Sequence, residues 1–230
     1  MNIFFSFLFC YFFFKFLLNY KGYQKINARD DVQMKRCDKN DIPDKIKGCF
    51  FQPEQFLGHC GKIDSQAALG YDDGTPCIIL KLNKMYGWLP KPIICPPPVI
   101  TNQNVTEQKD CDGLTRSEME WFQTVGRPGV PLHDLFNGYH IPVTCQGQHD
   151  PDQENLHTIH WEPREFHGSF PTFFYPYLNQ RGYLAPLVAA KFNVSRAVLL
   201  MIRCRAWAKN VHNIDVASRE GAVHFELMVD

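Results

Sequence analysis

The chain has 230 residues, and its 24 basic and 24 acidic side chains give it a formal net charge of zero. No block of lysine or arginine occurs, so the electrostatic footprint of a nucleic-acid-binding protein is missing. Hydrophobic residues make up 45% of the sequence, which is enough at this length to bury one sizeable core. We therefore expect one main domain and no nucleic-acid partner.

The cysteines indicate an oxidising compartment. Of nine cysteines, Cys10 lies in an apolar leader and the other eight lie between Cys37 and Cys204. An even count outside the leader suits up to four disulfides better than it suits buried free thiols. No Cys-x-x-Cys pair is present, which removes the usual zinc-ribbon and thioredoxin-like interpretations.

The N-terminal residues 1–20 form a hydrophobic leader or a truncated, atypical membrane anchor. Residues 3–18 are an apolar run of sixteen interrupted by Lys15, shorter than the ~20 residues of a spanning helix. No basic region precedes this run and no small-x-small cleavage site follows it, so it is also a weak signal peptide. Basic residues on its C-terminal side would leave the cysteine-rich part in the cytoplasm by the positive-inside rule, against the disulfides. The leader is therefore either a poor membrane signal or a start that replaces a longer anchor.

After a polar, stalk-like segment at 21–48, the sequence predicts short strands separated by turns. A β-rich run follows the turn signal Asp73-Gly74, and apolar and polar residues alternate with a period of two over 198–207 and 223–229. A shorter strand is expected at 141–145, and an acidic loop at 148–155. Many short strands with little helix favour a β-sandwich over residues 49–230.

Residues 95–130 form an expected excursion from this sandwich. It contains the N-glycosylation sequon at Asn104, with Cys95 and Cys111 on either side of this sequon. Thr115 and Glu118 match a capping box, which predicts one or two turns of helix before Gly126. We expect this excursion to be closed by a Cys95–Cys111 disulfide, to be glycosylated and to add little to the core.

An aromatic, proline-rich loop begins at Phe170 and carries Tyr175, Tyr177 and Tyr183. Its rings either pack in the core or dock a partner, and core packing is expected for most of them. A second sequon follows at Asn193.

Six histidines between His133 and His167 raise the question of a zinc site. His157 and His160 are three positions apart, and on a strand such a pair points to opposite faces. No H-E-x-x-H, Gly-x-Ser-x-Gly or P-loop motif occurs. We expect no catalytic residues, no metal and no cofactor.

Several segments together resemble the β subunits of the Na+/K+-ATPase and H+/K+-ATPase family, over roughly residues 16–230. The matching segments are Cys60-Gly61, Gly70-Tyr71, Gly74-x-Pro76-Cys77 through Asn83, Pro142-Val143-x-Cys145-x-Gly147, Tyr175-Pro176-Tyr177, Tyr183-Leu184-x-Pro186 through Ala189, and Cys204-x-Ala206. The resemblance implies an immunoglobulin-like sandwich outside the membrane on a single-span, type II anchor. It also implies three disulfides, Cys37 to Cys49, Cys60 to Cys77 and Cys145 to Cys204. Cys95 and Cys111 are additional, and their pairing rests on parity and spacing alone.

The resemblance implies a non-catalytic subunit. Such a subunit assists the folding, assembly and plasma-membrane delivery of a catalytic α subunit and modulates potassium transport. The Asp-Lys-Thr-Gly motif that P-type pumps phosphorylate is absent here. The expected partners are an α subunit, of a sodium or a proton pump, and the membrane. The alternatives are a glycosylated adhesion module without a pump partner and a secreted histidine-site metalloenzyme.

Overall fold

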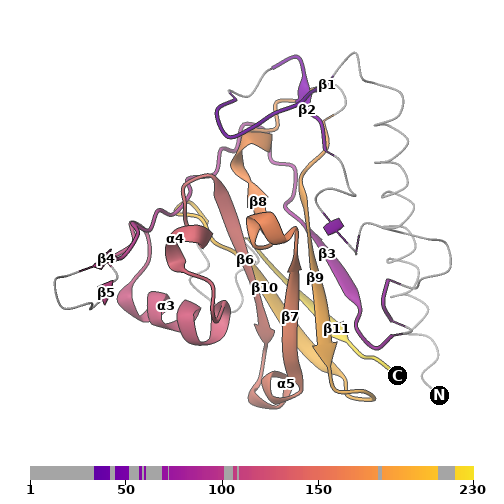
Figure 1. Ribbon diagram of the computed structural model, residues 1–230. Helices are drawn as coiled ribbons and strands as arrows, with labels where there is room; N and C mark the ends of the chain where they lie inside the picture. Colours follow the sequence, from indigo (N-terminus) through magenta and orange to yellow (C-terminus); the bar gives the residue numbers. More distant parts are fainter. Residues whose placement is uncertain are drawn as a thin grey trace.

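A computed structural model describes residues 34–41, 45–51, 57–58, 60, 69–71, 73–100, 106–107, 109–180, 183–211 and 221–230 (Figure 1). Two antiparallel sheets dominate it. The four-stranded sheet has the order β11 (Ala222–Leu227), β10 (Leu200–Ala206), β6 (His140–Gly147), β8 (Ser169–Pro171). The three-stranded sheet has the order β3 (Cys77–Lys81), β9 (Leu187–Val194), β7 (Leu156–Glu162). The expected all-β fold is confirmed.

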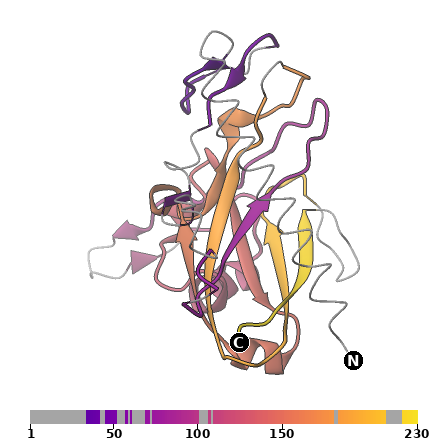
Figure 2. The ribbon, with the colours of Figure 1, turned by 90° about the vertical axis from the view of Figure 1, so that its right-hand side faces the viewer.

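The remaining elements are short. Two small pairs, one parallel and one antiparallel, are β1 (Met34–Lys35) with β2 (Gly48–Cys49) and β4 (Val99–Ile100) with β5 (Thr106–Glu107). The helical turns are α3 (Arg116–Trp121), the π-turn η1 (Phe122–Gly126), α4 (Leu132–Leu135), α5 (Asp150–Glu154), and the 3-10 turns η2 (Arg164–Phe166) and η3 (Thr172–Phe174). Figure 2, turned by 90°, shows the strands of the sandwich running along its length.

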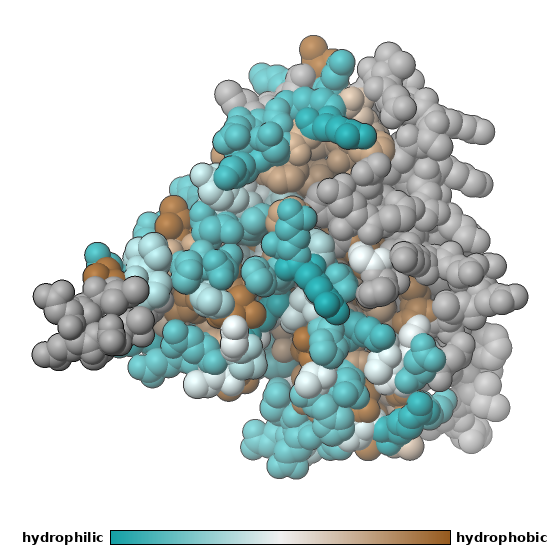
Figure 3. All heavy atoms as spheres, viewed as in Figure 1, coloured by the Kyte–Doolittle hydropathy of each residue, from teal (hydrophilic) through white to brown (hydrophobic). Residues whose placement is uncertain are grey.

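The main core lies between the two sheets. Along β10 the buried residues Leu200, Ile202, Cys204 and Ala206 alternate with more exposed ones, so the expected alternation is confirmed. Toward the end of the chain the predicted alternation is confirmed at Leu227 and Val229, which are buried, but it is wrong at Val223, which was predicted to face inward with them and is exposed. Strand β10 therefore turns one set of side chains inward, as the period of two requires. On the face seen in Figure 3, hydrophilic side chains predominate and hydrophobic ones form small patches between them.

Strand β9 was not predicted as a strand. Its first four residues, Leu187 to Ala190, are all buried, and it lies at the centre of its sheet between β3 and β7. A strand covered on both faces loses the alternation that reveals a half-exposed strand. The expected aromatic loop is thus shorter than predicted, because β8 and η3 occupy its beginning and β9 follows it.

The acidic segment at 148–155 was predicted as a loop, and this prediction is wrong. It contains helix α5, whose first turn is closed by Asp152. One carboxylate oxygen of Asp152 accepts a hydrogen bond from the His149 N–H at 2.9 Å, and the other accepts one from the Met201 N–H at 3.0 Å. Pro151 in the first turn suits a helix start, because that position needs no N–H.

The excursion builds a second, smaller core beside the sandwich (Figure 1). The expected capping box is confirmed: the Glu118 N–H donates to Thr115 Oγ1 at 3.3 Å, and the Thr115 N–H donates back to the Glu118 carboxylate at 2.8 Å. The buried members of this core, here called the satellite core, are Ile93, Cys95, Cys111, Met119, Phe122, Leu132, Leu135, Phe136 and Trp207. Since Trp207 directly follows β10, the excursion packs onto the end of a sandwich strand.

Buried Arg127 links the excursion to the sandwich. Its guanidinium donates to the carbonyl oxygens of Val143, on β6, and Gly168, and it lies 3.7 Å from the ring centroid of Trp161, on β7. Burial lowers its pKa well below the usual value. Arg127 therefore fastens the end of η1 to elements of both sheets.

Candidate partner-binding surface

Four disulfides form the framework of the molecule. They join Cys37 to Cys49, Cys60 to Cys77, Cys95 to Cys111, and Cys145 to Cys204. These are the pairs expected from the resemblance and, for Cys95 and Cys111, from parity and spacing. Cys145 and Cys204 are directly opposite each other on β6 and β10. This bridge therefore lies within one sheet, unlike the bridge between sheets in antibody domains.

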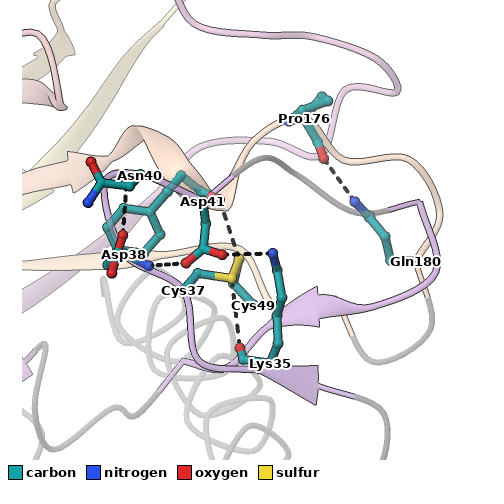
Figure 4. The surroundings of a disulfide bond; sticks show 9 residues. Lys35, Cys37, Asp38, Asn40, Asp41, Cys49, Pro176 and Gln180 are labelled. Carbon is teal, nitrogen blue, oxygen red and sulfur yellow. Dashed lines mark hydrogen bonds and ion pairs between the residues drawn. A yellow bond between two sulfur atoms is a disulfide. The ribbon is translucent and has the colours of Figure 1, made fainter.

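The Cys37–Cys49 bridge braces the chain next to the aromatic segment (Figure 4). Lys35 Nζ lies 2.9 Å from an Asp41 carboxylate oxygen, and the Asp38 N–H donates to the other oxygen at 2.6 Å. These bonds hold the pKa of Asp41 below its usual value, the backbone N–H of Asp38 having the largest effect. Cys49 Sγ lies 3.4 Å from the carbonyl oxygen of Phe173. The bridge is thus in contact with η3.

Two rings of the aromatic segment are anchored in the core. Phe174 packs edge-on against Phe51, with 5.7 Å between ring centroids. Tyr175 is buried and packs edge-on against Trp88 at 5.4 Å. Such edge-to-face pairs add about 0.5–1.5 kcal/mol to the burial of the rings.

Tyr177 and Tyr183 form a pair beneath Lys84. Their ring centroids are 4.9 Å apart, and the Lys84 ammonium lies 5.4 Å from each. Partial burial, and then the charge of Lys81, lower the pKa of Lys84. Tyr183 is buried, whereas Tyr177 is half-buried and donates from its hydroxyl to Asn179 at 2.9 Å.

The segment that follows β3 lies against Tyr177 and exposes apolar side chains. Tyr86 pairs with Tyr177 in a parallel bridge, and the Gly87 N–H donates to the Tyr177 carbonyl oxygen at 2.8 Å. Gly87 has a φ of +73°, which favours glycine at this turn. The exposed fractions are 75% for Tyr86, 49% for Met85 and 56% for Leu89. We call Met85, Tyr86, Leu89 and Tyr177 the tyrosine surface.

The three tyrosines singled out in the sequence therefore differ in position. Tyr175 and Tyr183 belong to the packed interior, as expected for most of the rings, and only Tyr177 reaches the surface. Sequence reasoning missed Met85, Tyr86 and Leu89. The sequence contains the apolar run Met85-Tyr86-Gly87-Trp88-Leu89. Such a run does not show by itself which of its side chains are packed and which are exposed.

The remaining candidate positions are distributed over other parts of the chain. Asn193 lies exposed on β9, whereas Asn104 and the apolar run at 3–18 fall outside the described residues. His157 and His160 lie on β7, where His157 Nε2 is 3.1 Å from Ser195 Oγ. The described residues contain no group of three or more potential metal ligands. Within that same part of the chain, no helix is both long enough and apolar enough to cross a bilayer.

Fold and surface together define a class: a disulfide-braced β-sandwich of the kind formed in oxidising compartments, with exposed apolar side chains on the tyrosine surface. The family profile described as "Sodium / potassium ATPase beta chain" matches residues 12–225. The chain belongs to this family.

Individual relatives agree with this assignment. The chain is 32% identical over 212 residues to "Sodium/potassium-transporting ATPase subunit beta-1" of Drosophila melanogaster, covering 91% of this chain and 58% of the relative. It is 32% identical to subunit beta-2 of the same organism, over 84% of this chain and 53% of the relative. A third relative, subunit beta-1 of Tetronarce californica, is 30% identical over 68% of this chain and 43% of its own length. The chain thus spans about half the length of the curated relatives it matches.

Proposed function

We propose that this chain is the non-catalytic β subunit of a P-type Na+/K+-transporting ATPase. In this role it assists the folding, assembly and plasma-membrane delivery of the catalytic α subunit and modulates potassium transport. The observation that carries the proposal is the family match across residues 12–225. The relatives are named as subunits of sodium/potassium pumps, so a sodium pump is the preferred partner over a proton pump.

The tyrosine surface is our candidate contact with the α subunit. Tyrosine is suited to interfaces because its ring buries a large area while its hydroxyl stays hydrogen-bonded. The ring of Tyr177 packs against the buried ring of Tyr183 and lies beneath the Lys84 ammonium, and Tyr86 is joined to Tyr177 by a backbone bridge. A surface that is ordered before binding loses little conformational freedom on association.

The proposed topology is single-pass type II, with the sandwich outside the plasma membrane. The four disulfides support an extracellular position. The Asn193 side chain of the second sequon is exposed, as a residue that carries a bulky N-linked glycan must be. Residues 1–20 would supply the atypical anchor.

Co-expression with an α subunit tests the function. The full chain, tagged, is expressed with a Na+/K+-ATPase α subunit, and surface α subunit is measured by biotinylation and co-purification. We expect the chain to raise surface α subunit several-fold over cells without it. No co-purification and no gain at the surface would contradict the proposal and favour an adhesion module.

Tyr86→Ala tests the contact surface, because its side chain is exposed and its loss should not disturb the core. We expect at least a threefold fall in co-purified α subunit, with glycan processing and thermal stability of the chain unchanged. Leu199→Ala is the matched control: Leu199 is 55% exposed but lies beyond the opposite end of β9. Equal recovery from both variants would show that the tyrosine surface is not the contact.

A further inference from the structure

A cavity of about 260 Å³ lies between α3 and the outer face of the four-stranded sheet. Three elements supply its lining: Trp121 from α3, Thr144 and Gln146 from β6, and Arg203 and Arg205 from β10, with Trp207 after β10. It is distinct from the tyrosine surface. Its volume lies just below the roughly 300–1,000 Å³ of most ligand pockets, so it can hold only a small molecule, about the size of a monosaccharide.

The strand register explains why these polar residues meet. Arg203 pairs with Gln146 and Arg205 with Thr144 across β10 and β6, while Cys204 and Cys145 between them form their disulfide. Because successive side chains alternate between faces, the residues on either side of the disulfide share the outer face. The bridge therefore holds the register that places Arg203 opposite Gln146 and Arg205 opposite Thr144.

The cavity carries an excess of positive charge. Two guanidinium groups line it, against the single carboxylate of Glu118. That carboxylate already accepts hydrogen bonds from the N–H and the hydroxyl of Thr115, both at 2.8 Å, in the capping box. The other acids near the start of α3 have their own cations, since Asp110 pairs with Arg116 at 3.4 Å and Asp112 pairs with Lys209.

Arg205 is held in place, and among the described residues it forms no ion pair with a carboxylate. Its guanidinium carbon lies 3.3 Å from the ring centroid of Trp207, and this contact fixes the orientation of the guanidinium group. Its Nε is enclosed and makes no hydrogen bond within the part of the chain that the structure describes. Burial, and to a smaller extent the charge of Arg203, lower the pKa of Arg205 to about 10, although the negative charge of Glu118 acts in the opposite direction. A bound anion would offset this loss of hydration.

Neutral donors complete the lining. Trp207 Nε1 donates to Thr144 Oγ1 at 2.8 Å, which leaves the Thr144 hydroxyl its own proton to donate. The Gln146 amide offers two more N–H groups. The ring of Trp121 adds an apolar wall beside them. This set resembles no catalytic arrangement, but it suits recognition of a planar anion.

We propose that this cavity, the Arg203–Arg205 pocket, binds the carboxylate of a small ring-bearing molecule of monosaccharide size. The arginine fork matches the two oxygens of a carboxylate, Thr144 and Gln146 donate to the remaining acceptors, and the ring of the ligand packs on Trp121. The inference does not depend on the proposed pump partner, because every residue in it belongs to this chain.

Titration of the purified full chain tests the pocket, with glucuronate and benzoate as acidic probes and glucose and benzamide as their neutral counterparts. Binding is followed by the fluorescence of the pocket tryptophans and by calorimetry. We expect at least one acidic probe to bind at least tenfold more tightly than its neutral counterpart, and less tightly as salt is raised. If neither acid binds, or if acid and neutral probe bind equally, the proposal is wrong.

Variants assign the binding to the arginines. Arg205→Gln should weaken binding of the acidic probe at least tenfold, whereas Arg116→Gln, which removes the same charge from an exposed side chain of α3, should change it less than twofold. Should Arg205→Gln fail to fold, Gln146→Glu keeps both arginines and places a carboxylate opposite Arg203. It should abolish binding while leaving the fold intact. Unchanged binding in the folded variants would overturn the proposal.

Discussion

The sandwich and the excursion are both closed by a disulfide, yet they reach stability by different routes. The main core is large and contains cysteines from three of the four bridges, including Cys204, whereas the satellite core has nine buried residues and one bridge. The satellite core also takes Trp207 from the sandwich. A small core cannot bury enough apolar surface on its own and needs such additional links. Among the described residues the main core takes none from 95–130, as expected, whereas the packing of the excursion into a core of its own was not predicted.

The largest expected effect on stability is the loss of a disulfide, and it should differ between the bridge of the sandwich and the bridge of the excursion. Cys145 and Cys204 are 59 positions apart, while Cys95 and Cys111 are 16 apart. By the loop-entropy estimate the longer loop is worth roughly 4 kcal/mol and the shorter one roughly 3. Cys204→Ser should therefore lower the free energy of unfolding more than Cys111→Ser, and more than Cys37→Ser, whose loop spans 12 positions. Chemical denaturation measures the ranking, and equal losses would contradict it.

The next effect concerns the junction between the two regions. Arg127→Ala removes hydrogen bonds to two buried carbonyl oxygens and a stacked contact with Trp161, and it should cost about 3 kcal/mol. Arg127→Met keeps much of the volume and removes the cost of burying a charge, so it should lose about half as much. Arg116→Ala is the exposed control and should change stability by less than about 0.5 kcal/mol. Equal losses for Ala and Met would show that the hydrogen bonds dominate over packing.

A smaller effect on stability depends on pH and arises from His140, in strand β6 of the sandwich. Burial, helped by nearby His167, lowers the pKa of His140 from 6.5 to about 4. Between pH 6.5 and about pH 4, His140 is therefore mostly neutral in the folded chain but mostly protonated in the unfolded chain. Its contribution to stability is complete above pH 6.5 and is lost as the pH falls toward 4. Because the ring is partly exposed, we expect a loss of about 2 kcal/mol, less than the full shift would give.

Melting curves between pH 7.5 and 4.5 test the role of His140. His140→Phe can still pack against Phe166, whose ring centroid is 4.9 Å from that of His140, and it should flatten the pH dependence. An identical pH profile in wild type and variant would assign the acid sensitivity to other groups.

The smallest effect is confined to the excursion. Thr115→Ala removes the side-chain cap of α3 and should cost about 1 kcal/mol. Hydrogen exchange should accelerate in residues 116–126 while β10 keeps its protection. Loss of protection in both regions would show that the satellite core and the sandwich unfold as one unit.

Sequence alone predicted the elements whose pattern is local. The alternation in β10 requires only a strand with one face in the core, and the capping box at Thr115 requires only residues three apart. The resemblance also led to three of the disulfide pairs, because cysteines within similar segments indicate the same bridges, and parity and spacing led to the fourth, Cys95 to Cys111. Neither inference needed the arrangement of distant segments.

Tertiary structure decided what depends on burial and register. The first half of strand β9 is covered on both faces and shows no alternation, and helix α5 depends on an Asp152 bond to the distant Met201. The tyrosine surface exists because Tyr86 and Tyr177, ninety-one positions apart in the sequence, meet in one bridge. The Arg203–Arg205 pocket needs the pairing of β10 with β6 and the packing of α3 above them. Sequence patterns record which face of an element is apolar, whereas only the folded chain determines which faces meet.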